Sequence, residues 1–136
     1  MTKLEIIKEA VNRYLMEQFG YKKNIAEYCR YSTNLQALTK KIDLYLRFID
    51  DTQILKNPTI IIARIEFKEQ QKGHGKRLLA FLCTLADEHG FSFIEMEGCT
   101  KNGAAFSEAF GFYPTGSQRL HWRTSVDDLK TALAKH

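Results

Sequence analysis

Two glycines one residue apart, Gly73 and Gly75, stand in a bend that also contains Lys72, Lys76 and Arg77. An apolar run precedes this bend and a helical pattern follows it. The first N–H groups of a helix have no intrahelical partner, and the helix dipole adds partial positive charge there. Glycines let such a backbone approach phosphate oxygens, because no β-carbon intervenes, and the basic side chains add mobile positive charge at the rim. The bend therefore predicts a site for an anionic, phosphate-bearing group.

Two familiar phosphate motifs do not fit this bend. In a P-loop, Gln70 would have to be glycine, and Arg77 stands where a magnesium-binding hydroxyl is needed. A dinucleotide-binding fingerprint that starts at Gly73 would need glycine in place of Leu78.

The pattern Q/R-x-x-G-x-G/A does fit, through Gln70, Gly73 and Gly75. With a strand pattern before it, a helix after it and the segment AFSEAFGFYPTG (105–116) downstream, the sequence resembles the GNAT superfamily of acyl-CoA-dependent N-acyltransferases from residue 59 to about residue 122. A generic α/β domain whose glycine bend is only a tight turn is the alternative.

The resemblance implies that the bend grips the diphosphate of coenzyme A and that the strand before it holds the pantetheine arm. Acetyl-CoA is the expected acyl donor, and an amine-bearing small molecule or protein is the expected acceptor. No metal is expected, because no His, Cys, Asp and Glu set has metal-ligand spacing. The residues expected to bind the coenzyme are Ile65, Phe67, Gln70, Gln71, Lys72, Gly73, His74, Gly75, Lys76 and Asn102.

The resemblance also implies direct attack of a neutral amine on the thioester, with a main-chain N–H near residues 65–67 stabilising the oxyanion. Glu66 ranks first as the proton acceptor, ahead of Glu95 and Glu97, and a solvated charge at a strand end is the alternative for each of the three. Ser107 stands where many relatives carry a tyrosine that protonates the thiolate. Serine is a poorer acid than tyrosine, so we expect Ser107 to hydrogen-bond the sulfur. Tyr113 is a substitute donor or a core aromatic.

The elements that must position these residues follow from their periodicity. A capping box at Thr2 opens a helix that ends near Gly20, and Asn24 with Glu27 predicts a second short helix through Tyr28. Residues 32–41 are ambiguous but favour a helix. Strands are expected at 42–49, 59–67 and 91–97, with a helix from 78 to 90 between the last two, so that these two strands are parallel. A helical piece at 104–110, two short strands around a turn at 114–117 and a helix capped by Ser125 complete the chain.

We therefore expect one α/β (α+β) domain over residues 1–136. It should have a GNAT-like mixed sheet with a parallel, splayed central strand pair, helices on both faces and a divergent, helical N-terminal part.

The 136 residues carry a formal charge of +4, which favours anionic partners but is too small to argue for nucleic acid. No signal peptide is apparent, and no window approaches the roughly 20 apolar residues of a membrane span. We expect a cytoplasmic location, reduced cysteines and acyl-CoA as a partner; nucleic acid is an unlikely partner and a homodimer fits the resemblance. A coenzyme-binding module with little catalysis and a small nucleic-acid-binding protein are the competing functions.

Overall fold

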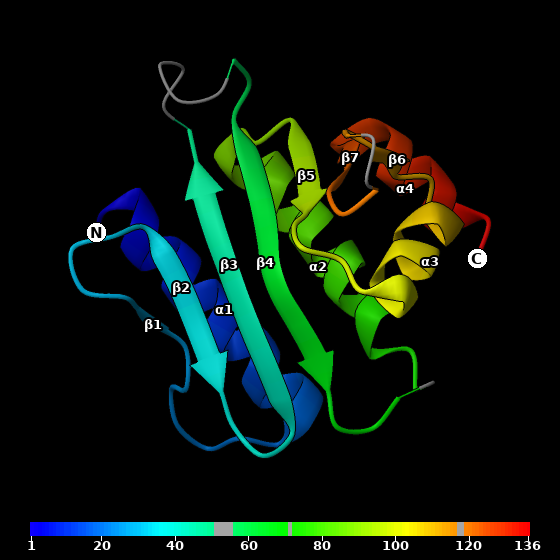
Figure 1. Cartoon of the computed structure of the whole chain (residues 1–136). Helices are drawn as coiled ribbons and strands as arrows, with labels where there is room; N and C mark the ends of the chain where they lie inside the picture. The colour runs from blue at the N-terminus through cyan, green and yellow to red at the C-terminus, as the bar shows by residue number, and fades with distance from the viewer. Residues whose placement is uncertain (51–55, 71, 117–118) are drawn as a thin grey trace.

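The computed structural model describes residues 1–50, 56–70, 72–116 and 119–136. Figure 1 shows how the helices and strands of these ranges are arranged. No helix in these ranges is long and apolar enough to cross a membrane. The elements are α1 (Lys3–Phe19), β1 (Glu27–Tyr28), β2 (Asn34–Leu38), β3 (Ile42–Ile49), β4 (Thr59–Phe67), α2 (His74–His89), β5 (Phe93–Met96), α3 (Lys101–Ala109), β6 (Tyr113–Pro114), β7 (Trp122–Ser125) and α4 (Val126–Ala134).

The strands form one mixed sheet in the order β1-β2-β3-β4-β5-β7-β6. β4 and β5 are parallel, as the strand–helix–strand pattern predicted, and they pair from Thr59 with Phe93 to Ile62 with Met96. β4 then continues to Phe67, and no strand among the described residues pairs with it on that side, so β4 and β5 part where the expected site lies. On the other side of β4, a register shift opposite Tyr45 and Leu46 leaves Ala63 unpaired with β3.

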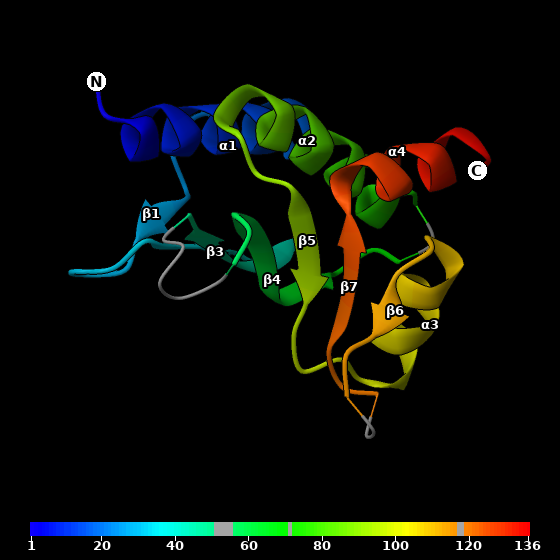
Figure 2. The same ribbon diagram turned by 90° about the horizontal axis from the view of Figure 1, so that it is seen from above.

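One face of the sheet carries the core. β3 alternates buried and half-buried residues along its length, and its inward side chains are apolar because they meet the helices. Figure 2 shows α1, α2 and α4 along one side of the sheet and α3 on the other side, beside β6 and β7. The described part of the chain is therefore an α+β domain with helices on both faces, as expected.

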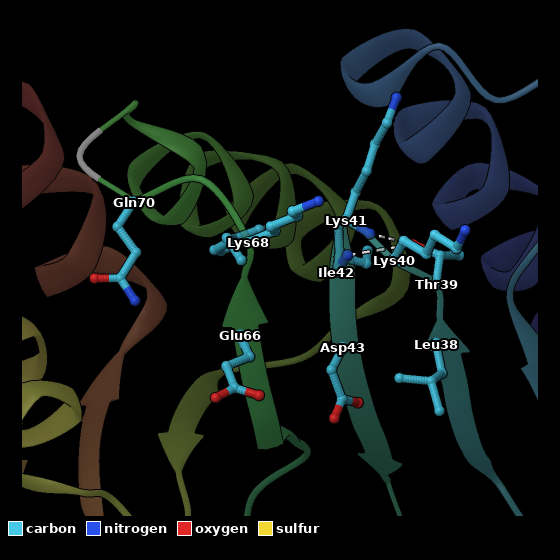
Figure 3. A pocket seen from close by; sticks show the side chains of 10 residues that line it. Leu38, Thr39, Lys40, Lys41, Ile42, Asp43, Glu66, Lys68 and Gln70 are labelled. Carbon is cyan, nitrogen blue, oxygen red and sulfur yellow. Dashed lines mark hydrogen bonds between the residues drawn. The ribbon is translucent and has the colours of Figure 1, made fainter.

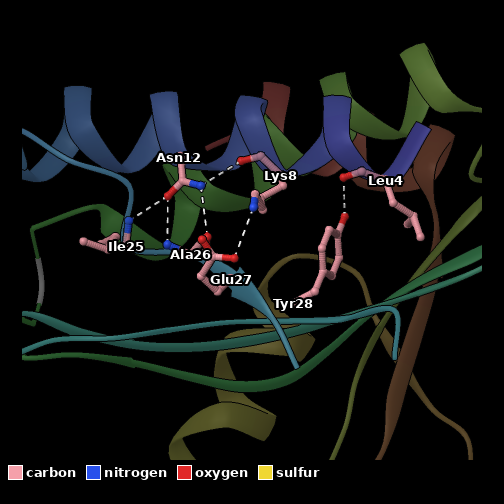
Figure 4. Close-up of polar contacts among 7 residues, drawn as sticks. All are labelled: Leu4, Lys8, Asn12, Ile25, Ala26, Glu27 and Tyr28. Carbon is pink, nitrogen blue, oxygen red and sulfur yellow. Dashed lines mark hydrogen bonds and ion pairs between the residues drawn. The ribbon is translucent and has the colours of Figure 1, made fainter. Parts of the chain in front are cut away.

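The expected helix from Asn24 to Tyr28 is wrong, because a side chain from α1 forms hydrogen bonds with the backbone of this segment. Asn12 is 1% exposed, and its Oδ1 accepts from the amides of Ile25 at 2.9 Å and Ala26 at 2.8 Å. Its Nδ2 donates to the carbonyl oxygens of Lys8 at 3.1 Å and Ala26 at 3.0 Å (Figure 4). Held extended at this point, the chain continues into the short strand β1.

The helical preference of residues 32–41 is also wrong, since residues 34–38 form β2. The strand pairs antiparallel with β3, where Leu35 faces Leu46 and Ala37 faces Leu44. Leu35 and Ala37 are both buried, as alternate residues of a strand are when one face of the sheet meets the core. This burial outweighs the helix-forming preference of the segment.

The C-terminal part follows the sequence with small shifts. α3 begins at Lys101, earlier than expected, because the Thr100 hydroxyl accepts from the amide of Gly103 and caps the helix. β6 and β7 are the two predicted short strands, although Ser117 of the predicted turn lies outside the described residues. Ser125 caps α4 through the amide of Asp128 at 3.1 Å, as expected.

Candidate active site

A groove of about 530 Å³ opens where β4 leaves β5, between the first turn of α2 and α3. It brings together most of the positions that the sequence singled out. Those lining it are Ile65, Glu66, Phe67, Gln70, Gly73, His74, Gly75, Lys76 and Asn102. Lys72 and Ser107 are not among its lining residues, and Gln71 lies outside the described residues.

The bend presents free backbone donors to this groove. Gly73 is the N-cap of α2 in the left-handed conformation, with φ of 78°, and no side chain caps the helix. Within the described residues, the amides of Gly73, His74, Gly75 and Lys76 donate no hydrogen bond. All four residues line the groove. The first turn of α2 can therefore supply several N–H groups to an anion at its dipole-positive end.

The charged side chains of the bend are less mobile than the sequence suggested. Lys76 Nζ contacts the carbonyl oxygen of His136. Arg77 Nη2 donates to the carbonyl oxygen of Lys72 at 2.8 Å. Two of the three expected rim cations are thus held by the protein itself.

Packing favours glycine at position 75. A β-carbon at this position would lie 2.9 Å from two ring carbons of Phe106. The ring of Phe106 in turn meets the ring of Phe110, with centroids 5.0 Å apart. Glycine at 75 therefore lets α3 pack closely against the first turn of α2.

Aromatic rings fix the other side of the bend. The ring of His74 lies 4.9 Å from the ring of Phe19 at the end of α1 and 5.3 Å from the ring of Phe67 at the end of β4. The rings of Phe19 and Phe67 are themselves stacked at 6.0 Å. The imidazole is committed to this cluster, so the contribution of His74 to the groove is chiefly its backbone.

The carboxylates near the groove differ in their partners. Glu95 pairs with Arg123 at 2.6 Å and Glu97 with Arg47 at 3.1 Å. Glu66 lines the groove, is exposed and has no cation within 4.0 Å among the described residues. A free carboxylate can take up a proton without breaking an ion pair, which distinguishes Glu66 from the other two.

Glu66 also lines a second cavity of about 290 Å³ on the β3 side of β4. Figure 3 shows its carboxylate beside that of Asp43, both on the same side of the sheet. The two residues are register partners, and Asp43 pairs with Arg64 at 3.5 Å. Phe67 and Gln70 line both hollows, so the end of β4 forms a wall between them.

Ser107 is fully buried in α3, and its hydroxyl donates to the carbonyl oxygen of Gly103 at 2.9 Å. The Sγ of Cys99 lies 4.0 Å away, and burial raises the pKa of that thiol. Gly103 lines the groove and is one turn from Ser107. The role of Ser107 toward a thioester stays a prediction. The other hydroxyl considered, on Tyr113, belongs to a side chain that is 49% exposed on β6 and not part of the core.

Several lining residues were missed from the sequence. The helix-spaced aromatics of the AFSEAFGF segment were the available signal for the groove wall on α3, because residues four apart share a helix face. The missed lining residues are Glu69, Met96, Thr100, Gly103, Phe106 and Phe110. No three His, Cys, Asp or Glu side chains come together as metal ligands within the described ranges.

Solved structures share this arrangement. AtaTR bound with AcCoA superposes with a TM-score of 0.52 and 14% identity over 72% of this chain and 68% of that one. The crystal structure of the KacTA–DNA complex superposes with a TM-score of 0.53 and 13% sequence identity, over 94% of this chain and 86% of that one. AtaT complexed with acetyl-methionyl-tRNAfMet superposes with a TM-score of 0.50 and 14% sequence identity, over 93% of this chain and 85% of that one. No protein-family model matches the chain, and the comparison with curated proteins found no match.

These likenesses show that the chain has the fold of GNAT acetyltransferases. One of those structures carries AcCoA. The other two contain DNA or an acetylated transfer RNA. The expectation that nucleic acid is an unlikely partner therefore receives no support.

Proposed function

We propose that the protein is an N-acyltransferase that moves an acyl group, acetyl first among them, from acyl-CoA to an amine. The observation that carries the proposal is that the amides from Gly73 to Lys76 donate no hydrogen bond to any described residue, while all four residues line the groove beside the end of β4. The fold shared with structures that hold acetyl-CoA supports it.

The coenzyme would lie along the groove. Its diphosphate would accept hydrogen bonds from the amides at the start of α2, where the helix dipole favours negative charge. Its pantetheine arm would pair with the unpartnered edge of β4 near Ile65 and Phe67, as an added strand would. Asn102, in the first turn of α3, offers an amide side chain on the opposite wall.

The chemistry balances without a metal. The amine nitrogen attacks the thioester carbonyl carbon, a C–N bond forms, and the C–S bond breaks as the thiolate leaves. A main-chain N–H near residues 65–67 would stabilise the oxyanion. The amine proton would pass to Glu66, directly or through water, and the thiolate would take a proton from solvent.

The first experiment is native mass spectrometry of the purified protein, followed by thermal unfolding with coenzyme A added. We expect coenzyme A to raise the melting temperature of the wild type, because a ligand that binds only the folded state stabilises it. Gly73→Glu should abolish the shift, since it puts bulk and negative charge against the diphosphate. Gly116→Glu is the matched control, because a β-carbon there meets nothing within 4 Å. An unchanged shift in Gly73→Glu would contradict the assignment of the bend.

The burial and hydrogen bonding of Ser107 favour a second candidate function. Its hydroxyl is buried and already bonded to Gly103, so a coenzyme-binding module with little catalysis is the rival. A panel of acceptors separates the two. It should include small amines, peptides and aminoacylated RNA, the last because a structure with this fold contains an acetylated transfer RNA. Tight coenzyme binding with no acyl transfer to any class would favour the module.

A further inference from the structure

The side chain of Arg77 is exposed, yet it folds back against the bend. Its Nη2 donates to the carbonyl oxygen of Lys72 at 2.8 Å and lies 3.0 Å from Nδ1 of His74. Its Nε donates to Oε1 of Gln18, near the end of α1, at 3.0 Å. One guanidinium therefore joins α1, the bend and the first turn of α2.

Gly73 makes this position available. A β-carbon at Gly73 would lie 2.9 Å from Nη1 of Arg77, so the guanidinium uses the space that any other residue would fill. The left-handed φ of 78° also favours glycine at this position. Gly73 thus serves the contact with Arg77 in addition to the approach of a ligand.

Holding two carbonyl groups fixes the direction of two amides. Arg77 Nη2 donates to the carbonyl oxygen of Lys72 at 2.8 Å, and the backbone N–H of residue 77, which does not depend on the side chain, donates to that of Gly73 at 3.1 Å. In a trans peptide the C=O and the following N–H point in opposite directions. The N–H groups of Gly73 and His74 are therefore turned away from Arg77, and both residues line the groove.

We propose that Arg77 is a positioning residue, which orients the amides of the bend and ties them to α1, and that it is not itself a phosphate ligand. The inference rests on the proposed function, because it takes the diphosphate of coenzyme A as the ligand of those amides. A bend that is already ordered loses little conformational freedom when the ligand binds. Lysine cannot replace the planar fork of arginine in this role, although it keeps the positive charge.

The variants Arg77→Lys, Arg77→Gln and Gln18→Ala test the proposal by calorimetric titration with coenzyme A. A phosphate ligand would keep most of its affinity as lysine and lose it as glutamine. A positioning residue should lose affinity in both, by about tenfold for the loss of one to two hydrogen bonds. Gln18→Ala should weaken binding in the same direction by a smaller factor, although Gln18 carries no charge. Arg13→Gln, an equal charge change at an exposed site on α1, should bind like the wild type.

Two further measurements separate positioning from general stability. In the ligand-free protein, tryptic cleavage after Lys72 should be faster in Arg77→Lys than in wild type, because the bend opens more often. In turnover, Arg77→Lys should raise KM for acyl-CoA and leave kcat unchanged.

The outcomes are distinct. Wild-type affinity and wild-type cleavage in Arg77→Lys would overturn the proposal while the coenzyme site stands. A wild-type protein that does not bind coenzyme A would overturn the proposed function and this inference with it.

Discussion

The α-carbon of Gly75 packs directly against the ring of Phe106, where a β-carbon would approach two ring carbons to 2.9 Å. The contact joins the first turn of α2 to α3 and forms one end of the groove. A glycine that the sequence explained by ligand access therefore has a second reason, which only the placement of α3 reveals.

Gly75→Ala should destabilise the fold and displace α3. Forcing an extra carbon into a packed contact typically costs about 1–3 kcal/mol. Urea denaturation measures the loss, and titration with coenzyme A measures its effect on the groove.

The double variant Gly75→Ala with Phe106→Leu is the control for this contact. Because leucine removes the ring atoms that the new methyl group meets, part of the lost stability should return. If Gly75→Ala is as stable as the wild type, the ring moves aside freely and the packing argument fails.

Local sequence signals predicted the bend and the elements on either side of it, but they did not predict β2. β4 was predicted from its β-branched, nearly continuous apolar run and α2 from its helical spacing, and the bend between them was recognised by its glycines. β2 was not, because Leu35 and Ala37 become buried only through pairing with Leu46 and Leu44 on β3. The Phe106 contact and the Arg77 fork likewise join residues that are distant along the chain or lie on different elements. Contacts between residues that are distant in sequence produce no periodic pattern that a single sequence could reveal.

Asn12 should be among the most sensitive polar positions. It satisfies the amides of Ile25 and Ala26 and is 1% exposed, so Asn12→Leu would leave buried donors without partners. We expect a loss of about 3 kcal/mol in the free energy of unfolding, measured in urea. Asn24→Ala is the matched control, because the exposed Asn24 caps no helix, and it should change stability by less than about 0.5 kcal/mol.

Stability should fall in alkali through two tyrosines. Burial raises the pKa of Tyr14 and of Tyr28 from 10.0 to about 12. The folded state therefore holds these protons more tightly than the unfolded state. Their contribution is fully present below pH 10 and is lost as the pH rises toward 12. The Tyr28 hydroxyl also donates to the carbonyl oxygen of Leu4 at 2.6 Å.

Tyr28→Phe tests this pH dependence. The variant should be less stable than the wild type at neutral pH, because the hydrogen bond to Leu4 is lost, yet its stability should fall less steeply above pH 10. Free energies of unfolding at a series of pH values give both slopes. Equal slopes would show that Tyr28 does not titrate in this window.

Glu66 and Glu97 separate the role of a free carboxylate from that of a paired one. Glu66→Gln should lower kcat by about 10²-fold, the lower end of the range for a general base, and leave the affinity for coenzyme A unchanged. Glu97→Gln loses only a partly exposed ion pair with Arg47, with side chains 34% and 38% exposed, and should leave kcat unchanged. Both variants need an acceptor from the panel, and kcat is measured across pH for each. If Glu97→Gln loses turnover and Glu66→Gln does not, the proton acceptor is Glu97, just after the end of β5, and its ion pair with Arg47 holds it in place. If neither variant loses turnover, the amine proton passes to water alone.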